Sequence, residues 1–159
     1  MLLKNIYNRN RVSNGFSLIE LMLSTTILII ILVGLLYTYV ACFELNEFSK
    51  NLTLINNGLQ AELEYVRETP FDSLTALDGQ TFSLNGFPNG SAIGAIEVYN
   101  SIYDDLKYVR LVACWRQKSQ RIIGEDKNLD GILQNSEDID GDTILDSPAE
   151  LSTLISKIN

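Results

Sequence analysis

The sequence predicts an α+β protein in which one long N-terminal helix packs on a small antiparallel sheet. Residues 21–43 form a run of 23 residues without a charge, and apolar residues at helical spacing follow it as far as Pro70. Short β-type segments separated by turn residues occupy the remainder. With 159 residues the chain has room for one such domain and not comfortably for two.

The charge of the chain argues against nucleic acid as a partner. The 12 basic and 20 acidic residues give a net charge of −8. Residues 1–15 hold Lys4, Arg9 and Arg11 and no acid, so the chain without them would carry 9 basic and 20 acidic residues, or −11. Phosphate backbones bind proteins through basic residues that release counterions. An acidic surface of this kind would be repelled.

The uncharged run at 21–43 predicts a membrane-spanning helix. A spanning helix needs about 20 apolar residues. A secretory signal peptide has a shorter apolar core and is cut after it. The basic residues before the run favour the cytoplasmic side, and Tyr37 and Tyr39 suit the opposite interface. We therefore expect a single-pass membrane protein whose remaining residues lie outside the cytoplasm.

Glu20 lies at the start of this apolar block and is a candidate functional residue. An unpaired carboxylate at membrane depth costs about 2.5 kcal/mol or more, so such residues usually have a partner or a role. The simpler alternative is an interfacial glutamate just below the lipid headgroups.

Six residues around Glu20, Gly15-Phe16-Ser17-Leu18-Ile19-Glu20, lie between the basic leader and the membrane-length run. This arrangement resembles the cleavage signature of type IV prepilins and type II secretion pseudopilins. The resemblance implies that the prepilin peptidase, a membrane aspartyl peptidase, cuts after Gly15 and methylates the new amino group of Phe16. It also implies that Glu20 pairs with the terminal amine of a neighbouring subunit during filament growth. A pair within one chain stays open, because Phe16 and Glu20 have the spacing of neighbours on a helix face.

The resemblance further implies a pilin-like ladle fold, with a membrane half and an amphipathic half of one helix and a sheet-bearing head. It implies insertion in the inner membrane and then assembly into a filament in the periplasm or on the cell surface. The partners would be other pilins or pseudopilins, the inner-membrane assembly platform and membrane lipid. Many major pilins carry a proline in the membrane half of the helix. Residues 16–69 contain none, which favours a minor pilin or pseudopilin.

The amphipathic half of the helix is predicted from a stripe of apolar residues that recur every three or four positions. The predicted helix runs from Phe16 to about Thr69, with 16–43 as the assembly segment and 44–69 as the amphipathic part. Pro70 ends it, because a residue before proline disfavours helical geometry. The stripe consists of Leu45, Phe48, Leu52, Ile55, Leu59, Leu63 and Val66.

The head, residues 70–159, is predicted to hold an antiparallel sheet with strands at 80–84, 95–99, 106–117, 121–123 and 151–155. In the longest segment alternate residues should face the helix stripe: Val109, Leu111, Ala113 and Trp115. The two cysteines, Cys42 and Cys114, would form a disulfide only if this strand met the membrane end of the helix. Buried free thiols are the simpler interpretation.

An acidic segment at 124–150 is the only candidate chemical site. Nine of the 20 acidic residues lie between Glu125 and Glu150, with Lys127 as the only base. Residues 126–137, here called the first loop, match the twelve-residue calcium-loop pattern throughout. The ligands would be Asp126, Asn128, Asp130, the Ile132 carbonyl and Glu137. A solvated acidic loop without an ion is the alternative.

A second copy of the pattern follows directly at residues 138–149, here called the second loop. Glu137-Asp138 repeats Glu125-Asp126, and the predicted ligands are Asp138, Asp140, Asp142, the Ile144 carbonyl and Asp146. Thr143 replaces the glycine and Ala149 replaces the closing glutamate, so Glu150 would have to close this loop. The segment resembles the loops of dockerins and thrombospondin repeats. One calcium ion, with a second at the second loop, would hold the insertion between the last two strands.

These features favour a structural filament subunit, a minor pilin or pseudopilin of a type IV pilus or a type II secretion machine. A calcium-dependent adhesin or a cargo-binding tip protein is the alternative. An enzyme is disfavoured, because the chain has no histidine and no nucleophile beside a recognisable base.

Overall fold

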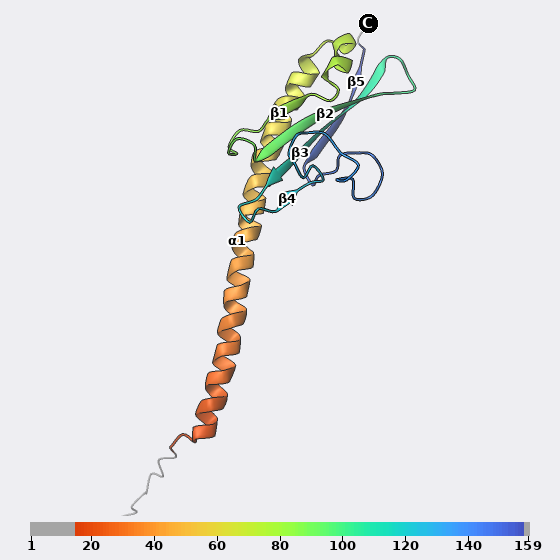
Figure 1. Cartoon of the computed structure of the whole chain (residues 1–159). Coiled ribbons are helices and arrows are strands. Elements are labelled where there is room, and N and C mark those ends of the chain that lie inside the picture. The colour runs from red at the N-terminus through yellow and green to blue at the C-terminus, as the bar shows by residue number, and fades with distance from the viewer. Residues whose placement is uncertain (1–14, 158–159) are drawn as a thin grey trace, which may run out of the picture. The chain divides into compact units, whose positions relative to one another are not determined.

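The computed structural model describes residues 15–157, so the predicted leader up to residue 14, with Lys4, Arg9 and Arg11, lies outside the described residues. The described chain divides into two compact units, one ending at Phe43 and one beginning at Glu44. Its elements confirm the α+β class (Figure 1). They are α1 (Leu18–Glu68), the 3-10 helix η1 (Phe71–Leu77), β1 (Thr81–Ser83), β2 (Ala92–Asn100), β3 (Leu106–Arg116), β4 (Ile122–Ile123) and β5 (Glu150–Ser156).

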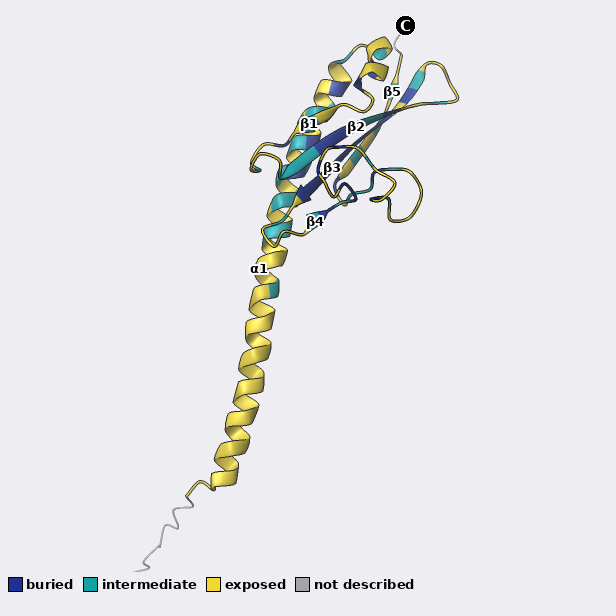
Figure 2. Ribbon diagram, in the orientation of Figure 1, coloured by how far each residue is buried: buried dark blue, intermediate teal, exposed yellow. Residues whose placement is uncertain are grey.

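The N-terminal unit consists of the apolar part of α1. Every residue from 15 to 40 is exposed in the chain by itself (Figure 2). The most apolar window of 18 residues has a mean hydropathy of 2.5, so the helix is long and apolar enough to cross a membrane. A helix that is apolar on all sides and buries none of them within its own chain needs lipid or other helices around it.

The start of α1 differs from the prediction. The helix begins at Leu18 and not at Phe16, and the Ser17 carbonyl accepts the first helical hydrogen bond, from the Leu21 amide at 3.1 Å. Serine is favoured at the residue before a helix, because its side-chain oxygen is able to accept a hydrogen bond from a backbone N–H that the first helical turn leaves unpaired. Phe16 therefore precedes the helix.

In the C-terminal unit, residues of the apolar stripe of α1 form the core. Ile55, Leu59 and Val66 are fully buried, and Phe48 and Leu52 pack beside them. The predicted stripe is wrong at its first member, because Leu45 is 66% exposed. The helix ends at Glu68, as Pro70 requires, and the chain turns at once into η1, which the sequence analysis did not anticipate. Leu74 and Leu77 of η1 complete the same core.

The sheet is antiparallel, with β3 at its centre. One side of β3 pairs with β2, and β1 lies beyond β2; the other side pairs with β4 near the end of β3 and with β5 along its first part. β2 begins at Ala92, earlier than the predicted start at 95. Gly94 in this extension has no side chain, which allows the Phe82 ring of β1 to lie directly over its backbone.

The two faces of β3 are covered by different layers. Val109, Leu111, Ala113 and Trp115 face the helix stripe, which confirms the prediction for this strand. Val112 and Cys114 on the opposite face, with Ala95 of β2, pack against Leu129 and Leu145 of the acidic segment. The insertion between β4 and β5 is therefore the third layer of this unit.

The two cysteines are free thiols. Cys114 is buried beneath the acidic segment, and this burial raises the pKa of its thiol to about 11. Cys42 is exposed in the chain by itself. The interpretation of buried thiols therefore holds for Cys114 and is wrong for Cys42.

Replacement of Leu59 by alanine tests the role of the stripe. Leu59 is completely buried, so Leu59→Ala should lower the free energy of unfolding by about 2–5 kcal/mol through lost burial and the cavity left behind. Urea unfolding of the detergent-solubilised chain, followed by circular dichroism, measures it. The exposed neighbour Gln60→Ala serves as the control, and equal effects of the two changes would contradict this packing.

Candidate functional sites at the N-terminal segment and the acidic segment

The candidate processing and assembly residues lie at the start of α1. Gly15 is exposed, and so is Phe16, which keeps 81% of its surface exposed. Glu20 is the acidic residue of the first helical turn, where the positive end of the helix dipole favours a carboxylate. Ser17 and Glu20 also have the spacing of a capping box. Within the described residues, however, neither the Ser17 nor the Glu20 side chain bonds to the backbone of this turn. Glu20 is exposed, so its carboxylate is accessible.

Residues 10–36 match the family model of the prokaryotic N-terminal methylation motif. The chain is type IV prepilin-like. The motif implies, in general terms, processing by a prepilin peptidase and other pilins as partners, and it belongs to structural pilin-type proteins and not to an enzyme family. No curated protein and no solved structure matches the chain significantly.

The second candidate site of this prepilin-like chain is the segment between β4 and β5, which contains no helix or strand. In the first loop Asp126 is fully buried and organises the turn. Its Oδ1 accepts a hydrogen bond from the Leu129 amide at 2.6 Å, and its Oδ2 accepts one from the Gly131 amide at 2.7 Å. Asp130 Oδ1 accepts a further bond from the Ile132 amide at 2.9 Å.

The second loop repeats these contacts at equivalent positions. Asp138 Oδ1 accepts from the Gly141 amide at 2.6 Å and Asp138 Oδ2 from the Thr143 amide at 3.1 Å. Asp142 Oδ1 accepts from the Ile144 amide at 2.7 Å. The internal repeat seen in the sequence is thus also a repeat of backbone geometry.

Thr143 does not disturb this geometry, although it replaces the glycine of the pattern. It has a φ of 66°, close to the 82° of its counterpart Gly131. Two positions earlier in each loop, Leu129 has a φ of 60° and Gly141 a φ of 81°. Left-handed conformations cost a non-glycine residue roughly 1–2 kcal/mol. In each loop these two positions hold one glycine and one non-glycine residue, both with a positive φ. The backbones of the two loops therefore follow the same path.

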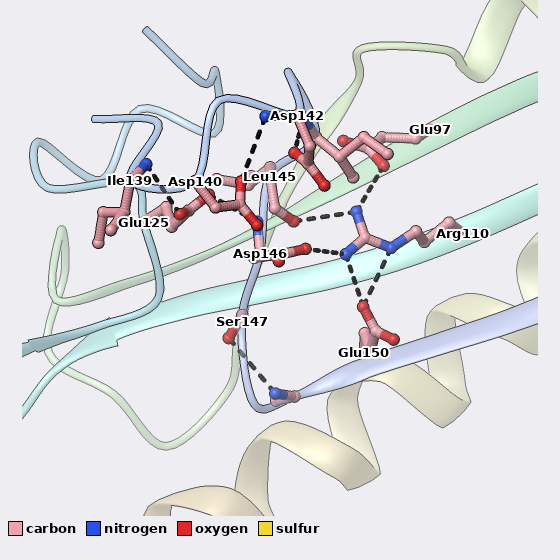
Figure 3. Close-up of polar contacts among 12 residues, drawn as sticks. Glu97, Arg110, Glu125, Ile139, Asp140, Asp142, Leu145, Asp146, Ser147 and Glu150 are labelled. Carbon is pink, nitrogen blue, oxygen red and sulfur yellow. Dashed lines mark hydrogen bonds and ion pairs between the residues drawn. The ribbon is translucent and has the colours of Figure 1, made fainter. Parts of the chain in front are cut away.

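One glutamate accepts backbone hydrogen bonds from each loop, and one of the two, Glu125, was not named as a site residue from the sequence. Glu137 Oε1 accepts from the amides of Lys127 and Asn128 at 3.0 and 3.2 Å in the first loop. In the second loop the matching carboxylate belongs to Glu125, whose Oε1 accepts from the Ile139 amide at 3.1 Å (Figure 3). The repeated Glu-Asp pair was the signal that could have identified Glu125.

Glu150, the closing residue expected from the sequence, lies elsewhere. Its Oε2 accepts hydrogen bonds from Arg110 Nη2 and Nε at 2.6 and 3.0 Å. Arg110 also pairs with Glu97 at 2.9 Å and with Asp146 at 3.0 Å, and it donates to the Leu145 carbonyl (Figure 3). This cluster ties the end of the second loop to the sheet.

The charge of Arg110 is stabilised in this cluster. Desolvation by burial lowers the pKa of its guanidinium, but the hydrogen bonds to Glu150 and Glu97 outweigh desolvation, and the pKa is raised. The guanidinium is therefore a permanent counter-charge for the carboxylates around it.

The carboxylates of the second loop are close together. One oxygen each of Glu125, Asp138 and Asp140 lie within 4.8 Å of one another, as do oxygens of Asp140, Asp142 and Asp146. The hydrogen bond from the Asp142 amide lowers the pKa of Asp140. Desolvation and the negative charges of Asp142, Glu125 and Asp146 outweigh that bond, so the pKa is raised.

The carboxylates that lie deepest have no basic partner. Glu125, Asp126 and Glu137 keep 7%, 0% and 5% of their surface exposed. None of the three takes part in an ion pair with any residue of the described chain. An ionised carboxylate is costly to bury unless it is paired or binds a metal.

In the first loop, two side-chain amides donate hydrogen bonds to one aspartate. Asn128 Nδ2 and Gln134 Nε2 donate to Asp130 Oδ2 at 2.9 and 3.0 Å. Oxygens are the ligands that calcium prefers, and the first loop supplies them from Asp126, Asn128, Asp130, the Ile132 carbonyl and Glu137. The donor set of both loops therefore fits a hard cation such as Ca²⁺.

Proposed function

We propose that this prepilin-like chain is a structural subunit of a type IV pilus-like filament, a minor pilin or a pseudopilin. The observation that carries the proposal is the methylation motif at the start of an apolar helix segment. No side chain of the most apolar part of this segment is buried within its own chain. Such a surface is suited first to lipid and then to the same segment of other subunits. The uninterrupted course of α1 from Leu18 to Glu68 supports a minor pilin or pseudopilin.

In this proposal the mature chain begins at Phe16, after cleavage behind Gly15. Glu20 pairs with the terminal amine of a neighbouring subunit, because a cation and a carboxylate in an apolar surrounding each stabilise the other. The chain would be anchored once in the inner membrane with its head outside the cytoplasm. The assembly platform would then move it into a filament in the periplasm or on the surface.

A calcium-dependent adhesin or cargo-binding tip protein is the alternative. The connection between β2 and β3 favours it, because Ile102 and Tyr103 there are 97% and 68% exposed. Exposed apolar side chains at a tip are suited to contact with another molecule. A type II secretion pseudopilus would use the same N-terminal segment.

We further propose that the head binds calcium in the first and second loops. The support is the repeated ligand pattern together with buried carboxylates that have no basic partner. Calcium would neutralise their charge and hold the insertion against β3. Extracellular modules of this type bind calcium with a Kd of about 10⁻⁴ to 10⁻³ M.

Gly15→Leu should block maturation, because a large side chain at the cut hinders an extended backbone in the protease cleft. Mass spectrometry of membrane fractions should find the uncut chain for the variant and a chain beginning at methylated Phe16 for the wild type. Gly34→Leu, within the apolar segment, is the control and should be processed. A variant with the same N-terminus as the wild type would disprove this cleavage site.

Glu20→Val should give a processed, membrane-inserted protein that is lost from sheared filaments by tenfold or more, because the amine of its neighbour has no partner. Immunoblots of sheared and membrane fractions measure this. Glu20→Gln, which removes only the charge, should behave in the same way. Glu44→Gln, an acid farther along α1, should assemble normally. Full incorporation of Glu20→Gln would refute the charge pairing.

Calcium should raise the melting temperature of the head. At about 100 times the Kd, a single bound ion stabilises a protein by about 2.7 kcal/mol. For a chain of this size that corresponds to a rise of roughly 5–10 °C. Thermal unfolding of the full chain in detergent, with calcium against chelator, measures it. Asp126→Asn should reduce the rise and Asp104→Asn should not. Equal melting temperatures of the wild type with calcium and with chelator would exclude the calcium proposal.

A further inference from the structure

We infer that Glu125, and not Glu150, is the closing calcium ligand of the second loop, so that the two loops form one interlocked site for two ions. Each glutamate precedes the first aspartate of one loop and closes the other. This inference rests on the proposed calcium binding and specifies its second site.

The two glutamates make equivalent contacts with the loops that they close. In each case Oε1 accepts from the amide that follows the first aspartate, and Oε2 accepts from an amide seven positions farther along. For Glu137 the donors are Lys127 at 3.0 Å and Gln134 at 3.4 Å. For Glu125 they are Ile139 at 3.1 Å and Asp146 at 3.3 Å. Because Glu137 occupies the closing position of the calcium pattern, Glu125 occupies the corresponding place in the second loop.

The Glu125 carboxylate lies close enough to two aspartates of the second loop to bind the same ion as they do. Its oxygen and those of Asp138 and Asp140 lie within 4.8 Å of one another. Calcium binds oxygens at about 2.3–2.6 Å, so two ligands on opposite sides of one ion are about 5 Å apart. The three oxygens therefore fit around a single Ca²⁺.

The burial of Glu125 is an independent indication of a cation. Its side chain lies beside the carboxylates of Asp138 and Asp140, is more than nine-tenths buried, and has no basic partner in the described chain. Two backbone amides bond to it, while a carboxylate accepts about four hydrogen bonds. The nearby guanidinium of Arg110 is occupied by Glu97, Asp146 and Glu150. Both Glu125 oxygens accept backbone hydrogen bonds, but the charge of the carboxylate has no cationic partner within the described chain.

Glu150 cannot serve in this place without leaving the sheet. It is the first residue of β5 and is paired in register with Val112 of β3. Its Oε2 accepts two hydrogen bonds from Arg110. Moving this carboxylate into the second loop would break both bonds and leave a buried guanidinium with one partner fewer.

The reciprocal arrangement makes the two ions interdependent. An ion in the second loop fixes Glu125 and with it the adjacent Asp126, the first ligand of the first loop. An ion in the first loop fixes Glu137 and the adjacent Asp138 in the same way. Binding that orders part of a second site lowers the entropic cost of filling it. The wild type should therefore bind calcium with a Hill coefficient above 1.

Calorimetric titration of the full-length chain in detergent with calcium alone tests the inference. The wild type should bind two ions per chain. Glu125→Gln should weaken the ion of the second loop at least tenfold, whereas Glu150→Gln, which only loosens the Arg110 cluster, should still bind two ions and weaken the second one much less. Glu125→Asp keeps the charge but shortens the side chain, so it should weaken the same ion. Circular dichroism in excess calcium shows whether each variant is folded.

The outcomes separate the two proposals. If Glu150→Gln loses one ion while Glu125→Gln keeps two, Glu150 closes the second loop. The calcium proposal then stands, but the inference that each loop is closed by the glutamate preceding the other is wrong. If Glu125→Gln does not fold, Glu125→Asp decides, and wild-type affinity in that variant would overturn the inference. A wild-type chain that binds no calcium would end both proposals.

Discussion

Strand β3 requires a cover on both of its faces, because every residue from Val109 to Trp115 is buried. The helix stripe covers one face with Ile55, Leu59 and Val66, and the acidic segment covers the other with Leu129 and Leu145. A strand buried on both sides is normally found between two regular layers. Here one layer is a segment without helix or strand, so the structure depends on how an acidic loop can be held in place.

Two kinds of contact hold that segment. Arg110 reaches from β3 and joins the end of the second loop to Glu97 and Glu150, which makes it an ionic anchor at the edge of the apolar layer. The aspartates and glutamates then use their side-chain oxygens to pair the backbone amides of the loops. This arrangement satisfies the backbone where no sheet or helix does so, as buried polar groups require. It also concentrates negative charge next to an apolar face, and this is the electrostatic problem that the proposed calcium ions would solve.

The two units pose different physical problems. Every residue of the apolar segment of α1 up to residue 40 is exposed in the single chain, and in the proposed function lipid or other subunits would cover it. The head buries its own core and keeps its acidic segment on the sheet. A filament subunit combines these properties, because assembly and stability of the head then rest on separate residues. The proposed calcium ions would accordingly stabilise the head without taking part in the contacts of the apolar segment.

Features carried by neighbouring residues were determined by the sequence itself: the prepilin motif, the helix that Pro70 ends, the alternation along β3, and both loops. The tertiary structure alone decided which distant residues meet. The start of α1 at Leu18, the exposure of Leu45 and the formation of η1 depend on local competition and packing that periodicity does not report. Arg110 and Glu150 are 40 positions apart, and Glu125 and Asp146 are 21 positions apart. Their pairing follows from how β3, β4 and β5 bring the two ends of the acidic segment together. The repeated Glu-Asp pair was a sequence signal for the contact of Glu125, whereas no spacing pattern indicated the pairing of Arg110 with Glu150.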